Sequence, residues 1–181
     1  AEPMHVQAAI PELAAAIAGL ALGPGDEGAE DPTAALGDAV APPAHWGDAT
    51  TVMMRNLPNK YTQRMLLAEI NNTGFLGNYD FLYLPIDPDT AANKGYAFLN
   101  FIGPGISWMF KVFYEGRKMK RFNSNKVVSV VPATLQGFEA NYAHYSSARV
   151  NRGDPAARPI FLREPSQPLP AAGGGARGGK G

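Results

Sequence analysis

Two aromatic side chains near the middle of the chain have the spacing needed to bind flat, unsaturated molecules. They belong to the octapeptide KGYAFLNF at residues 94–101, which predicts a β-strand whose side chains alternate between two faces. Tyr96, Phe98 and Asn100 share one face, while the Ala, Leu and Phe between and after them share the other and suit a core. Two rings beside an amide on a face that meets water predict a platform for stacking nucleobases. Asn100 is expected to read the edge of a base.

A second strand is predicted over residues 52–57, directly before Pro58. Alternation turns Met53 and Arg55 to the same face as the two rings. A thioether can pack on a base, and a guanidinium can reach a phosphate or stack by its plane. Ordinary core packing is the alternative for Met53.

The acidic and basic residues are unevenly distributed along the chain, although the net charge is zero. Residues 1–50 carry eight acidic and no basic residues, residues 51–131 carry ten basic and five acidic residues, and residues 132–181 carry six basic and three acidic residues. The basic parts are expected to attract a polyanion. The side chains expected to make salt-dependent contacts with a nucleic-acid backbone, with a solvated rim as the alternative for each, are Lys60, Lys94, Lys118, Lys120 and Arg121.

Several classes of site are excluded by composition. No cysteine is present, so disulfides and thiolate zinc sites cannot form. The three histidines are isolated, and neither a metal nor another cofactor is expected. No apolar run approaches the ~20 residues of a membrane span. These features predict an intracellular protein of the nucleus, the cytoplasm or both, without membrane contact.

Apolar periodicity predicts the elements that position the candidate residues. A helix capped by Thr62 is expected over 62–72, and a second helix over 103–116 has an apolar stripe of Ile106, Met109, Phe110 and Phe113. Further strands are expected over 79–84 and 126–131, and the two strands described above are expected to be central neighbours in one sheet. With the two strands above, this gives the order β-α-β-β-α-β, the ferredoxin-like split βαβ fold of the α+β class with a four-stranded antiparallel sheet. Both helices are expected to cover one face of the sheet, which leaves the rings on the other.

An extra C-terminal helix is predicted over residues 134–147. It either packs beside the fourth strand or crosses the open face of the sheet, where its two tyrosines would cover the platform rings. It is also a candidate contact for a protein partner. Its apolar stripe consists of Leu135, Phe138, Tyr142 and Tyr145.

The chain divides into four parts by composition. Residues 1–49 are rich in Ala, Gly, Pro and acidic groups and are expected to be mostly disordered, with a short helix at 11–22. Residues 50–133 hold the folded motif. Residues 134–163 form the extension, which contains the extra helix and a short extended piece at 158–162. Residues 164–181 form a disordered Gly- and Pro-rich tail.

The octapeptide matches seven of the eight positions of the RNA recognition motif signature, with Leu99 in place of Val. The chain also resembles the C-terminal RNA recognition motif of the Mei-two-like family of meiosis regulators over about residues 50–163. The resemblance implies binding of single-stranded RNA in post-transcriptional control of meiosis or development, and Met at the position of Met53 is usual in that family. The stretches that carry it are TTVMMRNLPNKYT at 50–62, DFLYLPID at 80–87, QG at 136–137 and RPI at 158–160.

Two other functions are weighed against RNA binding. The same fold can act as a protein-interaction module that grips a peptide, which the absence of a ring at Met53 and the extra helix favour. An enzyme on this fold, such as an acyl phosphatase, needs a phosphate-binding loop with Arg after the first strand. Arg55 lies within the strand and residues 58–60 are not glycine-rich, so no catalytic activity is expected. The chain is expected to be a monomer.

Overall fold

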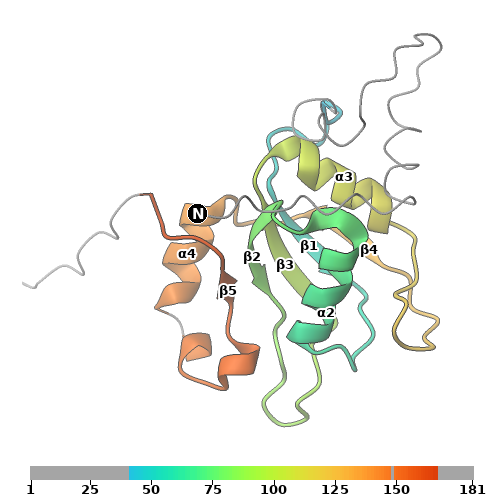
Figure 1. Cartoon of the computed structure of the whole chain (residues 1–181), viewed down its shortest axis with the longest axis vertical. Coiled ribbons are helices and arrows are strands. Elements are labelled where there is room, and N and C mark those ends of the chain that lie inside the picture. The colour runs from blue at the N-terminus through green and yellow to red at the C-terminus, as the bar shows by residue number, and fades with distance from the viewer. Residues whose placement is uncertain (1–40, 148, 167–181) are drawn as a thin grey trace, which may run out of the picture.

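The computed structural model describes residues 41–147 and 149–166, which are built around one antiparallel sheet (Figure 1). The strand order is β4-β1-β3-β2-β5. As predicted, β1 and β3 are central neighbours, so the two strands that carry the ring and arginine candidates lie side by side. The strands are β1 (Thr51–Arg55), β2 (Tyr79–Tyr83), β3 (Tyr96–Phe101), β4 (Ser129–Pro132) and β5 (Ile160–Phe161).

The helix α2 (Gln63–Ile70) follows β1 and lies on one face of the sheet. Its predicted cap is confirmed, because the Thr62 hydroxyl accepts a hydrogen bond from the Met65 backbone N–H at 3.2 Å. Leu66 and Ile70 are fully buried on its inner side. The helix runs into a wider turn, η1 (Asn71–Phe75), in which Gly74 takes φ 110° and reverses the chain toward β2.

The helix α3 (Pro104–Tyr114) covers the same face beside α2 (Figure 1). Proline in its first turn supplies a preset φ where an N–H would have no partner. The predicted apolar stripe is confirmed, since Ile106, Met109, Phe110 and Phe113 are all buried. Together with Val52, Met54, Ala97 and Leu99 from the sheet, these side chains form the main core.

The described residues before the expected boundary at residue 50 contact the folded motif. Trp46 is only 5% exposed, and its Nε1 donates to the Ser107 hydroxyl of α3 at 3.0 Å. Its ring also contacts Trp108 edge-on at 5.3 Å. One large aromatic side chain anchors a segment whose overall composition is that of a linker. The helix expected at 11–22 and the tail from residue 167 lie outside the described residues.

Strand β4 begins three residues later than predicted. Its first predicted residues pair instead with the turn after α3, since the Val128 N–H donates to the Arg117 carbonyl at 2.8 Å and the Gly116 N–H donates to the Val128 carbonyl at 2.9 Å. The strand proper therefore starts at Ser129, opposite Arg55 of β1.

The extra helix is present as α4 (Phe138–Ser146), on the opposite face of the sheet from α2 and α3 (Figure 1). It starts four residues later than predicted, because Gly137 takes φ 92°, outside the helical region, and the residues before it bond to β1. The Ala133 N–H, for example, donates to the Thr51 carbonyl at 2.9 Å. The extension then makes two short turns, Arg149–Asn151 and Pro155–Ala157.

The predicted extended piece at 158–162 forms β5, which pairs antiparallel with β2. The sheet therefore has five strands where the sequence predicts four. A two-residue strand has no alternation pattern to read, so its pairing is visible only once the neighbouring edge of β2 is known.

Candidate nucleic-acid interface on the open face of the sheet

The strand register places the expected contact residues in two rows across the sheet. Phe98 of β3 lies opposite Met53 of β1, and Tyr96 lies opposite Arg55. Strand β4 continues the rows, with Val131 beside Met53 and Ser129 beside Arg55. Directly paired residues point to the same face. We call this surface the platform: Phe98, Met53 and Val131 in one row, and Tyr96, Arg55 and Ser129 in the other.

The platform is accessible in the structure. Tyr96, Phe98 and Met53 are partly exposed and Arg55 is exposed. The rings of Tyr96 and Phe98 meet edge-on, with centroids 5.7 Å apart and planes at 75°. Arg55 is held over the sheet by a 3.2 Å hydrogen bond from its Nη2 to the Ser129 hydroxyl. The two rings are therefore not sealed by the C-terminal extension.

The other half of this face is covered by α4. Phe81 and Tyr83 of β2 form a second aromatic core with Phe138 of α4. Tyr145 of α4 lies flat on both strand residues, with its ring 5.5 Å from Phe81 and 5.1 Å from Tyr83. Phe98 packs against the edge of this cluster. The helix thus takes the β2 side of the face and leaves the β4-β1-β3 side open.

Tyrosine hydroxyls gather where the covered half meets the open half. Burial, followed by electrostatic repulsion from Tyr145 and Tyr96, raises the pKa of Tyr83 above its usual 10.0. Burial and then Tyr96 raise the pKa of Tyr145 in the same way. The hydroxyls of Tyr83 and Tyr145 are therefore protonated at neutral pH, and each can donate a hydrogen bond beside the platform.

Asn100 has a different role from the expected reading of a base edge. It is 3% exposed, and its Oδ1 accepts hydrogen bonds from the Thr50 and Thr51 hydroxyls at 2.8 Å each. Its Nδ2 donates to the Asp80 carboxylate at 2.8 Å. The extension closes over this row, since Asn141 of α4 bonds to the Thr51 hydroxyl at 3.2 Å. The Asn100 amide joins β1, β2 and β3 internally, and we leave it out of the proposed site.

The far end of the extension is fastened to the same polar row. Arg163 donates from Nε to the Asp80 carboxylate at 3.1 Å, and its guanidinium lies 3.7 Å above the Phe138 ring. Its Nη1 is 3.4 Å from the Glu139 carboxylate. Arg163 therefore connects β2 to α4 and holds the helix against the sheet.

Two of the expected backbone contacts lie near the Tyr96 end of the sheet. Lys60 and Lys94 are exposed, and their loops are joined because the Asn59 Nδ2 donates to the Asn93 carbonyl at 2.9 Å. A third lysine of this region, Lys126, donates to the Asn59 Oδ1 at 2.6 Å. This end of the sheet therefore combines positive charge with the exposed ring of Tyr96.

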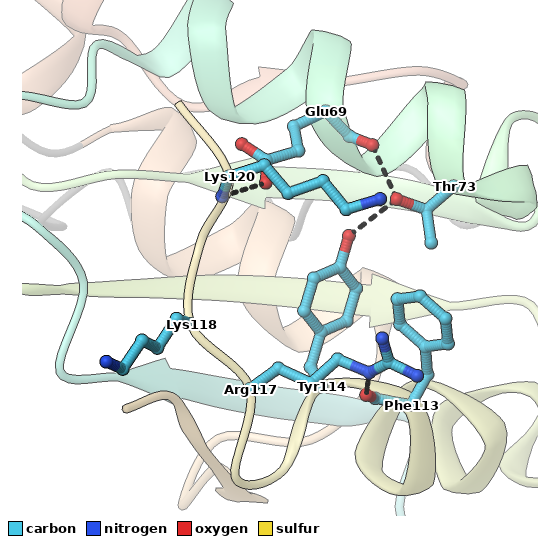
Figure 2. A pocket seen from close by; sticks show the side chains of 7 residues that line it. All are labelled: Glu69, Thr73, Phe113, Tyr114, Arg117, Lys118 and Lys120. Atoms are coloured by element: carbon cyan, nitrogen blue, oxygen red, sulfur yellow. Dashed lines mark hydrogen bonds between the residues drawn. The ribbon is translucent and has the colours of Figure 1, made fainter. Parts of the chain in front are cut away.

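The remaining expected backbone contacts are not brought to the platform. Lys118 and Lys120 line a pocket formed by α2, η1 and the end of α3, on the helical side of the sheet (Figure 2). Arg121 follows them and bonds through its backbone N–H to the Tyr61 hydroxyl at 3.0 Å. These three residues were expected to contact the nucleic-acid backbone because of their charge, but the loop after α3 turns toward the helices.

Sequence reasoning missed two residues of this face and left the position of a third, Tyr145, open. Ser129 and Val131 belong to the platform through their register with β1, and Tyr145 forms its wall. Alternation along β4 was the available signal for the first two. The flat contact of Tyr145 with β2 depends on where α4 docks, which no local pattern gives.

Within the described residues, no group of three or more acidic or histidine side chains is arranged to hold a metal ion. In the same part of the chain, every helix is too short or too polar to cross a bilayer.

These features match a known family. The family described as RNA recognition motif 2 matches residues 49–146, from two residues before β1 to the last residue of α4, and the chain belongs to this family. The split βαβ fold with helices on one face of an antiparallel sheet is therefore an RNA recognition motif. The family is not an enzymatic one, and RNA binding is the function that membership indicates.

Similar curated proteins carry the name MEI2-like, which confirms the resemblance found in the sequence. MEI2-like 5 of Arabidopsis thaliana is 43% identical over 119 residues, which are 66% of this chain and 15% of that protein. MEI2-like 5 of Oryza sativa subsp. japonica is 45% identical over 113 residues, 62% of this chain and 14% of that protein. The chain thus spans about 15% of the length of the first of these relatives.

Similar solved structures include the Rna15 RNA recognition motif with bound GU RNA, at 18% identity and a TM-score of 0.43 over 55% of this chain and 99% of that chain. A Sex-lethal protein–RNA complex is 25% identical, with a TM-score of 0.40 over 49% of each chain.

Proposed function

We propose that the platform binds single-stranded RNA, with Tyr96 and Phe98 each taking the face of a base or a sugar. The observation that carries the proposal is the pairing of β1 with β3, which sets two partly exposed rings beside Met53 and Arg55 on an accessible face. Single-stranded bases can be splayed out and stacked on such rings. Each stacked base contributes about 1–3 kcal/mol by alanine substitution.

Charge orients the RNA backbone on this surface. Arg55 is exposed in the middle of the Tyr96 row, between Tyr96 and Ser129, where its guanidinium can contact a phosphate or stack on a base. Lys60 and Lys94 lie on the adjoining loops and add a salt-dependent attraction. The hydroxyl of Tyr96 and those of Tyr83 and Tyr145 supply donors toward a base at the α4 wall.

The position of α4 limits how many bases the sheet can accept. The ring of Tyr145 already lies parallel to Tyr83 and Phe81, in the manner of a base stacked on the β2 side. The open side then offers two aromatic contacts in β3, at the lower end of the two or three bases usual for this fold. We therefore propose a short recognition element centred on about two nucleotides.

The peptide-binding alternative loses one of the two features that favoured it, the extra helix. The apolar stripe of α4 was a candidate surface for a partner, but Phe138, Tyr142 and Tyr145 pack against β2 and β5 within the chain. We accordingly expect a monomer that binds RNA without catalytic activity. By its family, we propose a role in post-transcriptional control of meiosis or development, inside the cell, in the nucleus or the cytoplasm.

The test is a titration of the full chain with a pool of random single-stranded RNA at two salt concentrations. RNA binding by the platform requires saturable affinity that weakens as salt rises. A selection from the same pool then gives the recognised sequence. Saturable binding that is insensitive to salt and unaffected by Tyr96→Ala would contradict the proposal, as would the absence of saturable binding.

A further inference from the structure

The helical side of the sheet carries a cavity of about 160 Å³ at the junction of α2, η1 and the end of α3 (Figure 2). We call it the basic pocket. It lies across the sheet from the platform, since α2 and α3 pack on the opposite face from Tyr96 and Phe98. The basic pocket is lined by Glu69, Thr73, Phe113, Tyr114, Arg117, Lys118 and Lys120.

The charge of the basic pocket favours an anionic occupant. Three of its residues are cationic and one is acidic. The carboxylate of Glu69 is already bonded inside the chain, because its Oε1 accepts the Lys120 backbone N–H at 3.0 Å and its Oε2 accepts the Tyr61 hydroxyl. The lone pairs of Glu69 are thus partly satisfied, which leaves Arg117 and Lys118 as the cations considered for an anionic occupant.

The pocket wall is held in place by contacts within the chain. The Arg117 Nε donates to the Phe113 carbonyl at 2.5 Å, and its guanidinium lies 4.0 Å above the Phe113 ring. The hydroxyls of Thr73 and Tyr114 bond to each other at 2.9 Å at the base of the pocket. Figure 2 shows Arg117 and Lys118 on the loop that follows α3. A cavity of this size holds the end of a carboxylate side chain.

The chain itself contains a segment of complementary charge. Residues 1–40 have seven acidic residues and no Lys or Arg, and the run DEGAED at 26–31 concentrates four of them. This segment joins the domain on the helical side, because Trp46 is bonded to Ser107 of α3. Tyr114 is seven residues further along the same helix, about 10 Å at 1.5 Å per residue.

The connection between the acidic run and the anchor is long enough. Residues 31 to 46 are fifteen residues apart in the sequence, and an extended chain covers up to ~3.5 Å per residue. The reach of about 50 Å far exceeds the length of α3. Docking within the chain also raises the local concentration of the acidic run at the pocket.

We propose that the basic pocket binds the acidic run at residues 26–31 of this same chain. The carboxylates of the run lie against Arg117 and Lys118, on the face of the domain that the RNA platform does not use. The pocket then serves as an intramolecular docking site for an acidic segment, and its residues are separate from those of the RNA platform.

Zero-length carbodiimide crosslinking of the full chain, followed by mass spectrometry, tests this proposal. Amide crosslinks are expected from Lys118 or Lys120 to acidic residues within 26–31, in preference to crosslinks from Lys60 or Lys94. Mixing ¹⁴N- and ¹⁵N-labelled chains separates crosslinks within a chain from those between chains. At about 1 M salt, where the Debye length is ~3 Å, the preferred crosslinks should be lost.

Matched variants complete the design. Neutralising the run (Asp26→Asn, Glu27→Gln, Glu30→Gln and Asp31→Asn) should shift the backbone amide resonances of residues 117–120, whereas Glu2→Gln with Glu12→Gln should leave them in place. Arg117→Gln should lower the crosslink yield at Lys118, and Arg152→Gln on the C-terminal extension should not.

Crosslinks between chains would assign the pocket to a second copy. Shifts produced there by RNA in the neutralised chain would assign it to RNA, and crosslinks spread evenly over exposed lysines would indicate no site. Each of these three results overturns the proposal.

Discussion

At the residue scale, the two platform rings differ although they share one face and one strand. Phe98 packs against the aromatic cluster under α4, so its removal changes both the surface and the packing. Tyr96 lies at the open end of β3, where its ring contacts the Phe98 ring edge-on. Tyr96 is therefore the residue at which a loss of RNA stacking can be separated from a loss of stability.

Replacing Tyr96 by alanine is expected to weaken RNA binding with little effect on folding. The loss of one stacked base corresponds to about 1–3 kcal/mol, roughly 5- to 150-fold in the dissociation constant. Tyr96→Phe keeps the ring and should retain most of the affinity. Fluorescence anisotropy with labelled RNA measures the affinity, and urea unfolding checks the fold. Unchanged affinity of a well-folded Tyr96→Ala chain would exclude stacking at this position.

Arg55 is the last residue of β1, with its guanidinium bonded to Ser129, and we propose it as the phosphate contact of the platform. Arg55→Gln is expected to reduce the slope of log affinity against log salt by about one. The slope is obtained from titrations at several salt concentrations, with Arg152→Gln as the control at an exposed position of the extension. An unchanged slope together with weaker binding would mean that Arg55 stacks on a base rather than neutralising a phosphate.

The sequence predicts which side of a strand a residue faces more securely than what covers that side. Alternation correctly put Tyr96, Phe98, Met53 and Arg55 on one face, because the pleat depends only on local backbone geometry. The same alternation put Asn100 there, yet the row of Asn100 is closed by Asn141 and by the residues before α4. That closure joins residues about ninety positions apart in sequence, so no local pattern contains it.

At the element scale, the C-terminal extension decides the width of the platform. Its helix α4 and strand β5 both attach to β2, and Arg163 fastens them through Asp80 and Phe138. Asp80 is 6% exposed, so its carboxylate depends on Arg163 and Asn100 for partners. The extension is therefore a fixed part of the domain.

Arg163→Gln is expected to loosen this attachment. It removes a charged partner from a buried carboxylate and the cation above Phe138, which together should lower the free energy of unfolding by about 1–2 kcal/mol. Urea unfolding measures the loss, and hydrogen exchange should show it as faster exchange in α4 and β5. If hydrogen exchange in α4 is unchanged while hydrogen exchange in β1 becomes faster, Arg163 does not attach the extension to the sheet.

Trp46 gives a test of where the domain begins. Trp46→Ala removes a buried indole and its hydrogen bond to Ser107, and is expected to cost about 3 kcal/mol or more of unfolding free energy. His45→Ala, at the neighbouring position whose ring meets Trp108 at 5.6 Å, is the matched control and should cost much less. If the Trp46→Ala chain is as stable as the unchanged chain, the domain boundary lies at residue 50.

The elements with strong periodicity were predictable, and those set by long-range pairing were not. The stripe of α3 and the cap of α2 are local features, and both appear where expected. Strand β5 has two residues, too few for a pattern, and forms because β2 has a free edge. The start of α4 is fixed by Gly137 and by the pairing of Ala133 with β1. The predicted stripe began at Leu135 and therefore made the helix too long at its N-terminal end.

At the scale of the whole molecule, opposite charges are separated along the chain. The first 40 residues are acidic, whereas the region from residue 51 onward has a net positive charge. A neutral total therefore hides a positive domain next to a tethered polyanion. The tether brings negative charge near the domain at all times, so it should compete with the attraction of the domain for RNA.

Neutralising the seven acidic residues within 1–40, as Asn or Gln, is expected to raise RNA affinity severalfold at low salt. The competition is electrostatic, so the gain should shrink as salt increases and largely vanish near 1 M, where the Debye length is ~3 Å. Anisotropy titrations of the two full chains over a salt series measure the gain.

Arg117→Gln, which alters the basic pocket and leaves the platform intact, separates two origins of the effect. If the tether acts only through its overall field, the gain on neutralisation is the same with and without Arg117→Gln. If docking in the pocket holds the acidic run away from the platform, Arg117→Gln releases it and makes the gain larger. A gain that is independent of salt would show that the acidic segment acts by something other than its charge.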